Sequence, residues 1–244
     1  MVIVLGFYKR KPGLTHEEFC RHWLDIHAPL TLGLNRSLME KNDRLAERNR
    51  DFFHARKLLV LNVVSSPGSG KTTFIRETAV QLTGRLRLGV IVGDLATDND
   101  AARLKTAGIP VIQITTGTVC HLDADMVATA AAQLDLNQLD VLVIENVGNL
   151  VCPADYDLGE DLRVVLLSTT EGEDKPLKYP PMFHSAQVAI VTKSDLAVAA
   201  GFDRKLALAN LNRVSHHAQI FELSAKTGEG MKAWLDYLVQ QRTG

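Results

Sequence analysis

The amino-acid sequence predicts an α/β protein in which helices flank a mostly parallel sheet. From residue 57 onward, short runs of Val, Ile and Leu alternate with segments of helical pattern. Such continuous apolar runs are typical of strands that are buried on both faces, as in parallel sheets covered by helices. With 46% apolar and 23% charged residues among 244, the composition is that of a globular chain and excludes disordered, collagen-like and coiled-coil classes.

Charge and cysteine content limit the partners and the cellular compartment that we expect for this protein. A net charge of −1 gives no reason to expect a nucleic acid or a membrane surface as partner. No apolar run reaches the ~18–20 residues of a membrane span, and the order of apolar and charged residues at the start is the reverse of a signal peptide. Three cysteines are too few for a disulfide scaffold. We therefore expect a cytoplasmic protein.

The sequence predicts three parts: an appended segment (1–30), an N-terminal helix (31–56) and the main domain (57–244). In the first, 2–8 reads as a strand, and Thr15 with Glu18 forms a capping box for a helix that ends near His27. In the second, a helix is expected over 35–55, where Leu38, Leu45 and Phe52 recur every seven positions. The main domain alternates strands and helices. The expected strands are 58–64, 88–92, 110–114, 140–145, 163–168, 187–192 and 219–223, and the expected helices 71–83, 98–107, 122–134, 203–213 and 229–241.

The first strand of the main domain leads directly into a phosphate-binding loop, SSPGSGKTT at 65–73. Glycines allow backbone N–H groups to turn toward phosphate oxygens, and the N-terminus of the following helix adds partial positive charge. Lys71 is expected to reach the β- and γ-phosphates, and the Thr72 hydroxyl to bind Mg²⁺. The general pattern begins with Gly where this chain has Ser65. The predicted nucleotide-binding residues of this loop are Gly68, Ser69, Gly70, Lys71, Thr72 and Thr73. Between a strand and a helix, this loop predicts the P-loop NTPase fold for the α/β domain.

The expected strand 187–192 ends in Thr-Lys-Ser-Asp, which resembles the guanine-reading motif of GTPases with Thr192 in place of Asn. Asp195 can accept hydrogen bonds from N1–H and the 2-amino group of guanine, and adenine offers no such pair. The stem of Lys193 can cover one face of the base. Ser224, Ala225 and Lys226 follow the last strand, as the second guanine-side loop of GTPases does. The sequence therefore predicts GTP as the nucleotide.

Two acidic residues end expected strands beside the phosphate loop. Asp94 and Glu145 are candidates for the Mg²⁺ site and, with Lys71, for catalysis. Gly148 can offer its N–H to the γ-phosphate and so sense hydrolysis. We expect slow hydrolysis, because no water-activating Gln or cis arginine finger is evident.

Cys120, His121 and Cys152 form a candidate metal site in loops that follow strands. Thiolate and imidazole ligands suit Ni²⁺ or Zn²⁺ rather than Mg²⁺, and three ligands leave a position for water or a second subunit. The spacing alone leaves structural cysteines as an equal alternative. Because Cys152 lies four residues after Gly148, we hypothesise that nucleotide state gates metal release.

Together these segments resemble the HypB family of hydrogenase nickel-incorporation GTPases, of the SIMIBI class, from about residue 35 to the C-terminal end. The matching segments are the helix from Asn35 to Asn49, SSPGSGKTT, GDLATDND, TGTVCHLDADM, ENVGNLVCP, TEGEDKPLKYP, TKSD and SAKTGEGM. The resemblance implies nickel or zinc binding at Cys120, His121 and Cys152. It implies a homodimer formed on GTP binding, with the metal site at its interface. It also implies nickel delivery to a [NiFe]-hydrogenase large-subunit precursor, with a HypA-type nickel metallochaperone as partner.

Other interpretations remain open from the sequence. The urease-type nickel accessory GTPase is the nearest relative of this family, although the segments CHL and ENVGNLVCP favour the hydrogenase branch. A GTP-dependent interaction switch with structural thiols is a second alternative, and an ATP-using P-loop kinase, which the TKSD motif disfavours, is a third. Residues 1–30 resemble the opening of EthD-like ferredoxin-fold proteins, and we expect no function from His16, Cys20 and His27 there.

Overall fold

We describe the protein from a computed structural model that describes residues 15, 17–18, 21 and 28–243. The chain divides between Lys41 and Asn42 into two units, and the second unit carries the sheet. In the first unit, Thr15 Oγ1 accepts a hydrogen bond from the Glu18 N–H (3.2 Å), and the Glu18 carboxylate accepts one from the Thr15 N–H (2.8 Å). The predicted capping box is thus present.

Several expectations for the N-terminal segment lie outside the described residues. These are the strand over 2–8, most of the helix that follows the capping box, and the side chains of His16, Cys20 and His27. The proposed boundaries after residues 30 and 56 stay predictions.

Helix α2 (Ala28–His54) begins seven residues before the expected start at 35. Pro29 falls in its first turn, where a proline is tolerated because that N–H has no helical partner. The seven-residue repeat does not mark the buried face, since Leu38 and Phe52 are 60% and 41% exposed. In the second unit the buried residues of α2 are instead Asn42, Ala46, Asn49 and Phe53.

Within the described residues, seven parallel strands form one sheet in the order β3-β2-β4-β1-β5-β6-β7. The strands are β1 (Leu59–Ser65), β2 (Leu88–Asp94), β3 (Val111–Thr115), β4 (Val141–Glu145), β5 (Leu162–Ser168), β6 (Val188–Thr192) and β7 (Gln219–Glu222). The α/β prediction is confirmed, and the strand positions agree within two residues. Because all strands run the same way, their carboxyl ends and the loops that follow meet at one edge of the sheet.

The sequence located the five longer helices of the main domain and missed two short ones. The former are α3 (Lys71–Leu82), α4 (Asn99–Thr106), α5 (Ala124–Ala131), α8 (Arg204–Val214) and α9 (Met231–Thr243). The latter are α6 (Lys175–Lys178) and α7 (Pro180–Ser185), each with proline in its first turn. Short 3₁₀ turns add η2 (Leu136–Gln138), η3 (Cys152–Asp155) and η4 (Ser194–Leu196). Single-turn helices rich in proline carry too little periodicity to be predicted.

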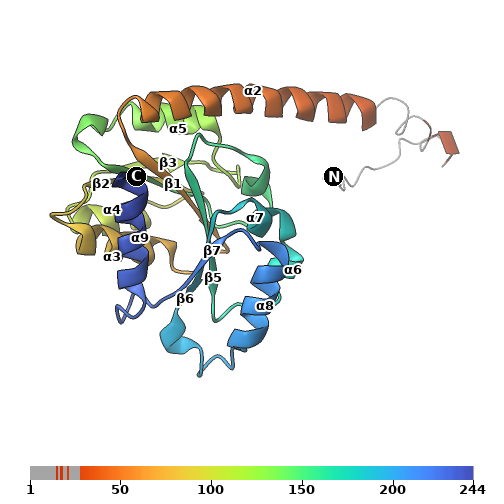
Figure 1. Ribbon diagram of the computed structural model, residues 1–244. Helices are drawn as coiled ribbons and strands as arrows, with labels where there is room; N and C mark the ends of the chain where they lie inside the picture. Colours follow the sequence, from red (N-terminus) through yellow and green to blue (C-terminus); the bar gives the residue numbers. More distant parts are fainter. Residues whose placement is uncertain (1–14, 16, 19–20, 22–27, 244) are drawn as a thin grey trace. The chain divides into compact units, whose positions relative to one another are not determined.

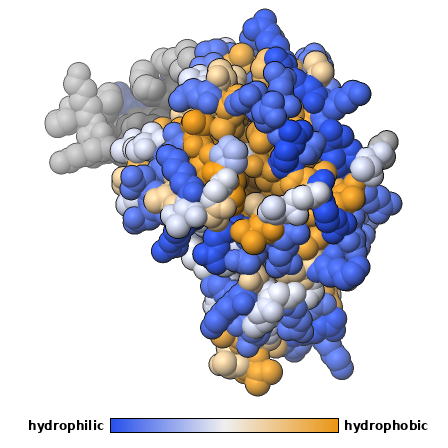
Figure 2. All heavy atoms as spheres, turned by 90° about the vertical axis from the view of Figure 1, so that its left-hand side faces the viewer, coloured by the Kyte–Doolittle hydropathy of each residue, from blue (hydrophilic) through white to orange (hydrophobic). Residues whose placement is uncertain are grey.

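Helices cover both faces of the sheet (Figure 1). Apolar side chains of α3, α4 and α9 pack on one face, around Trp234, whose Nε1–H donates to Thr78 Oγ1 (3.0 Å). On the other face, α5 and Phe53 pack against β1, β2 and β4, and α7 and α8 against β5 and β6. Figure 2 shows hydrophilic and apolar side chains mixed on the surface that carries α3, α4 and α9. Among the described residues, no helix has the length and apolarity needed to cross a membrane.

Candidate nucleotide site and metal centre

The phosphate loop turns between β1 and α3 through two glycines in the left-handed region. Gly68 has φ +76° and Gly70 has φ +94°, conformations that L side chains rarely adopt. Helix α3 begins at Lys71, so its unpaired N–H groups face the loop that precedes it. This local geometry is what a phosphate-binding loop requires.

Lys71 is buried at the start of α3, and its Nζ donates to Ser65 Oγ (3.1 Å). Burial lowers the pKa of Lys71, while the nearby carboxylates of Glu145 and Asp100 act in the opposite direction. Ser65 occupies the position where the general pattern has glycine. Its hydroxyl donates to the Ser66 carbonyl (2.7 Å) within the loop, so the serine fits without distorting the turn.

Thr72 and Glu145 meet at the end of β4. The Thr72 hydroxyl donates to Glu145 Oε1 (2.7 Å), and Oε2 of Glu145 is buried without a hydrogen-bond partner among the described residues. Burial raises the pKa of Glu145 to about 7, against the opposing effects of Lys71 and Thr72. A hydroxyl beside an unpaired buried carboxylate oxygen is a donor set that suits Mg²⁺.

Asp94 lies at the end of β2 and caps its own turn. Its Oδ1 accepts hydrogen bonds from the N–H groups of Ala96 (2.9 Å) and Thr97 (2.8 Å). Although burial acts to raise its pKa, these bonds hold the pKa of Asp94 below its ordinary value. Its role at the magnesium site stays a prediction.

The segment after β4 packs directly on the phosphate loop. A Cβ added at Gly148 would lie 3.0 Å from the Cα of Pro67, so a larger residue there would require the phosphate loop to shift by a few tenths of an ångström. The buried Asn146 side chain joins this segment to the metal loop, since its Oδ1 accepts hydrogen bonds from the N–H groups of Val147 (2.9 Å) and Leu122 (3.2 Å). Asn146 was not singled out from the sequence.

A cavity of about 280 Å³ opens beside the phosphate loop, where the base of a nucleotide is expected. Its lining includes the predicted base-side residues Lys193, Asp195, Ser224, Ala225 and Lys226. The remaining lining residues are Ser69, Gly70, Thr73, Phe74, Thr192 and Leu196. Asp195 Oδ1 accepts a hydrogen bond from Ser224 Oγ (2.7 Å), which joins the two predicted guanine-side loops. Lys193 has φ +59°, and its Nζ donates to the Gly68 carbonyl (2.8 Å).

The loop after β5 also contacts the phosphate loop, which sequence reasoning did not foresee. The hydroxyl of Ser69 donates to the Glu171 carboxylate, and Lys175 Nζ lies 3.4 Å from Ser66 Oγ. Both acidic and basic groups therefore border the phosphate position. The available signals were the position of this segment after a buried strand and its place in the family-like segment TEGEDKPLKYP.

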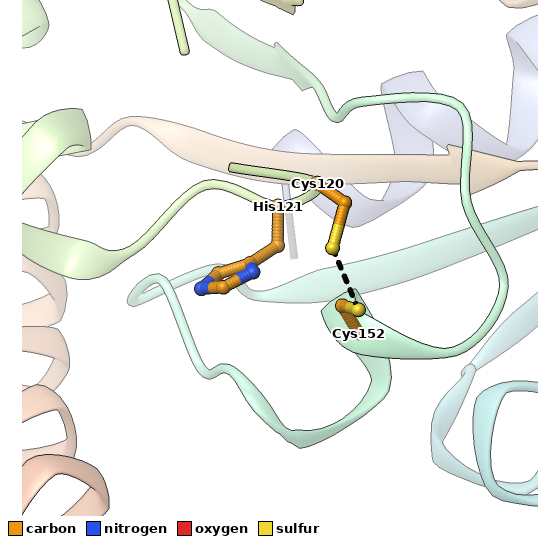
Figure 3. A group of neighbouring side chains, drawn as sticks. All are labelled: Cys120, His121 and Cys152. Atoms are coloured by element: carbon orange, nitrogen blue, oxygen red, sulfur yellow. Dashed lines mark hydrogen bonds between the residues drawn. The ribbon is translucent and has the colours of Figure 1, made fainter. Parts of the chain in front are cut away.

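The predicted metal-site residues come together at the same edge of the sheet. One ligand atom from each of Cys120, His121 and Cys152 lies within 4.8 Å of the other two (Figure 3). Cys120 and His121 lie between β3 and α5, and Cys152 begins η3. The two thiols are free and only partly exposed, with their sulfur atoms 2.7 Å apart. The hydrogen bond to Cys152 and burial raise the pKa of Cys120.

His121 is held by an aromatic neighbour. Its ring stacks on Tyr156, with centroids 3.9 Å apart and an interplanar angle of 29°. Burial lowers the pKa of His121, which favours the neutral imidazole that binds metals. Its Nδ1 is buried without a hydrogen-bond partner among the described residues. Two sulfur ligands and an imidazole with a free nitrogen suit Ni²⁺ or Zn²⁺.

Two buried asparagines of α2 hydrogen-bond to the segments that follow the candidate metal ligands. Asn49 Nδ2 donates to the carbonyls of Ala124 (2.8 Å) and Leu158 (3.1 Å). Asn42 donates to the Asp157 carbonyl (2.8 Å) and accepts from the Ala124 N–H (3.0 Å). Ala124 follows Cys120 and His121, whereas residues 157 and 158 follow η3. Helix α2 therefore fixes the spacing of the two loops that carry the candidate ligands.

The fold and the site define a P-loop nucleotide-binding protein that also carries a cluster of two thiols and an imidazole. The model of the CobW/HypB/UreG nucleotide-binding domain matches residues 59–222. The chain is 53% identical over 227 residues to the hydrogenase maturation factor HypB of Escherichia coli K12, covering 93% of this chain and 78% of that protein. The chain belongs to the HypB family.

Solved structures of the same family agree with this fold. HypB of Helicobacter pylori, crystallised in complex with nickel, is 39% identical with a TM-score of 0.79, covering 83% of this chain and 95% of that one. HypB of Archaeoglobus fulgidus is 37% identical with a TM-score of 0.78, covering 84% and 100%. The family resemblance stated from the motifs is confirmed.

Proposed function

We propose that the protein is a GTP-hydrolysing metallochaperone that binds nickel and assists its insertion into the large subunit of [NiFe]-hydrogenase. The observation that carries the proposal is the convergence of Cys120, His121 and Cys152 at the edge of the sheet that also carries the phosphate loop. Family membership supports it, because the E. coli relative is a hydrogenase maturation factor and the H. pylori relative was crystallised with nickel.

The phosphate loop would hold GTP through its N–H groups and Lys71. Thr72 and Glu145, with Asp94 nearby on the next strand, would hold Mg²⁺, which would neutralise charge on the phosphate oxygens. In the base cavity, Asp195 would accept hydrogen bonds from guanine, and Ser224 would hold that carboxylate in place.

Guanine selectivity can be tested at Asp195. Replacing it with alanine leaves two guanine donors unpaired, so GTP binding should weaken by about ten- to a hundredfold, from a loss of about 1–3 kcal/mol. ATP binding should be weak and unchanged. The control is Asp236→Ala, at an exposed ion pair on α9. Equal binding of ATP and GTP by the unsubstituted protein would contradict the proposal.

Nickel binding can be tested by titrating Ni²⁺ into the reduced protein and following thiolate-to-nickel absorption. We expect saturable binding that Cys120→Ala and Cys152→Ala each abolish. Cys20→Ala is the matched control, because it removes the third cysteine of the sequence. If the variants retain the absorption band but lose stability, the thiols are structural and a guanine-nucleotide switch becomes the better account.

Coupling between the two sites would run through the segment from Gly148 to Cys152. Gly148 lies against Pro67 of the phosphate loop, so movement of that loop on hydrolysis would shift the Cys152 thiol. Nickel affinity should therefore differ between GDP and a non-hydrolysable GTP analogue. Equal affinities would exclude the coupling.

The proposed partners are a second copy of this chain in the GTP state, a HypA-type nickel metallochaperone and the hydrogenase large-subunit precursor. Zinc is proposed as an alternative metal at the same ligands, and the cytoplasm as the compartment. Light scattering with GTP and with GDP tests the dimer, and co-purification with each protein tests the other two partners.

A further inference from the structure

Three exposed histidines meet on the surface away from the nucleotide cavity and the Cys120 loop. His184 lies near the end of α7, and His216 and His217 form the turn between α8 and β7. The ring centroids of His184 and His217 are 5.4 Å apart, and those of His216 and His217 are 5.5 Å apart. Neither pair includes a residue used by the sites described above.

The backbone that carries these histidines is fixed by side-chain hydrogen bonds. The buried Ser215 hydroxyl donates to the Phe183 carbonyl, which ties the end of α7 to the turn after α8. His184 Nδ1 lies 3.2 Å from the Val214 carbonyl oxygen. A carbonyl oxygen only accepts, so Nδ1 carries the proton and the lone pair of the neutral ring lies on Nε2. Metal-binding histidines are commonly held in this way.

The distances between the histidine rings are close to those expected for imidazoles that bind one metal ion. Two imidazoles bound to one ion at about 2.0–2.1 Å have ring centres about 4.5–5 Å apart. The observed 5.4 and 5.5 Å separations exceed that by less than an ångström. Among the described residues, only Cys120, His121 and Cys152 already bring three ligand atoms within 4.8 Å. With the His184 ring held on the Val214 carbonyl, the exposed rings of His216 and His217 must therefore rotate to close on an ion.

We propose that His184, His216 and His217 form a second metal site, made of imidazole alone, that binds a divalent transition metal such as Ni²⁺. Imidazole ligands suit nickel, copper and zinc, and water would complete the coordination. Without thiolates, this site should bind more weakly than the cysteine-containing centre and exchange its metal more readily.

Equilibrium dialysis with Ni²⁺ at pH 7.5 tests the site on the full chain. His184→Ala and His217→Ala should each raise the dissociation constant of one bound nickel at least about tenfold, since losing even an outer-shell partner of a ligand costs about 10–100-fold. The thiolate-to-nickel absorption should be unchanged. The matched control is His54→Ala, which removes another exposed histidine, on α2.

A second measurement locates the ion. Paramagnetic Ni²⁺ should broaden the amide resonances of residues 183–185 and 214–218, and this broadening should disappear in His217→Ala. The metal-free variants should keep the thermal midpoint of the parent protein, because all three side chains are exposed. The proposal is overturned if the variants bind as much nickel as the parent, if His54→Ala lowers binding equally, or if these resonances stay sharp.

Discussion

Replacing Asn49 with alanine should destabilise the protein and weaken its metal centre. The Asn49 amide donates to the carbonyl of Ala124, the first residue of α5, and to the carbonyl of Leu158, in the loop that follows η3. Its side chain is 6% exposed, so water does not replace these bonds freely.

The expected loss of unfolding free energy follows from the hydrogen bonds that the two carbonyls lose. A buried polar group left without its partner costs about 1–3 kcal/mol. Ala124 opens α5 and keeps its place in the helix, so its share is at the lower end, and the total is about 2–3 kcal/mol. In a domain of this size, 1 kcal/mol shifts the thermal midpoint by about 2–4 °C. We therefore expect Asn49→Ala to lower it by roughly 4–12 °C.

Urea unfolding and a nickel titration at a temperature where both proteins are folded measure the two effects. The matched control is Glu47→Ala, an exposed position on the same helix, which should change the unfolding free energy by less than ~0.5 kcal/mol. We expect nickel affinity to fall about tenfold in the asparagine variant, as for other outer-shell losses. If Asn49→Ala behaves like the control in both measurements, α2 does not hold the metal loops in place.

Two further predictions concern the phosphate loop and the loss of stability at low pH. Gly148→Ala would place a Cβ 3.0 Å from the Cα of Pro67, so GTP affinity should fall at least about tenfold by isothermal titration; unchanged affinity would show that the two segments move apart freely. Burial acts to raise the pKa of Asp140, but hydrogen bonds from the Arg87 backbone and side chain hold that pKa below its ordinary value. The stabilisation is therefore fully present above the unfolded pKa of about 3.9 and lost as pH falls through the folded pKa. Asp140→Asn should lower the unfolding free energy by about 1 kcal/mol at pH 7, and the difference should shrink as pH falls through the folded pKa of Asp140; a difference that stays constant as the pH falls would contradict the assignment.

The strands and the phosphate loop could be predicted because local sequence determines them. Buried parallel strands need continuous apolar runs, and the loop needs glycine where φ is positive, as at Gly68 and Gly70. The candidate ligands Cys120, His121 and Cys152 could be named because each follows a strand, and parallel strands place such loops at one edge.

What the sequence did not reveal depends on contacts between distant segments. The buried face of α2 carries Asn42 and Asn49 because they pair with loop backbone, so its apolar repeat misleads about which side faces the core. Likewise, Tyr156 reaches His121 and Glu171 reaches Ser69 only through the folded chain. Such contacts between distant residues cannot be predicted from their spacing in the sequence.

The central position of β1 has a consequence for how the protein is made. This strand pairs on one side with β4 and on the other with β5, as in Val63 with Glu145 and Ser65 with Leu166. Its neighbours in the sheet therefore leave the ribosome long after the phosphate loop does, and long loops must close before they pair. In a nascent chain that ends before β5, one edge of the apolar strand β1 has no partner. Such a chain should need chaperone protection until β5 emerges, and full nucleotide affinity should follow only when the loops that carry Asp195 and Ser224 have also emerged.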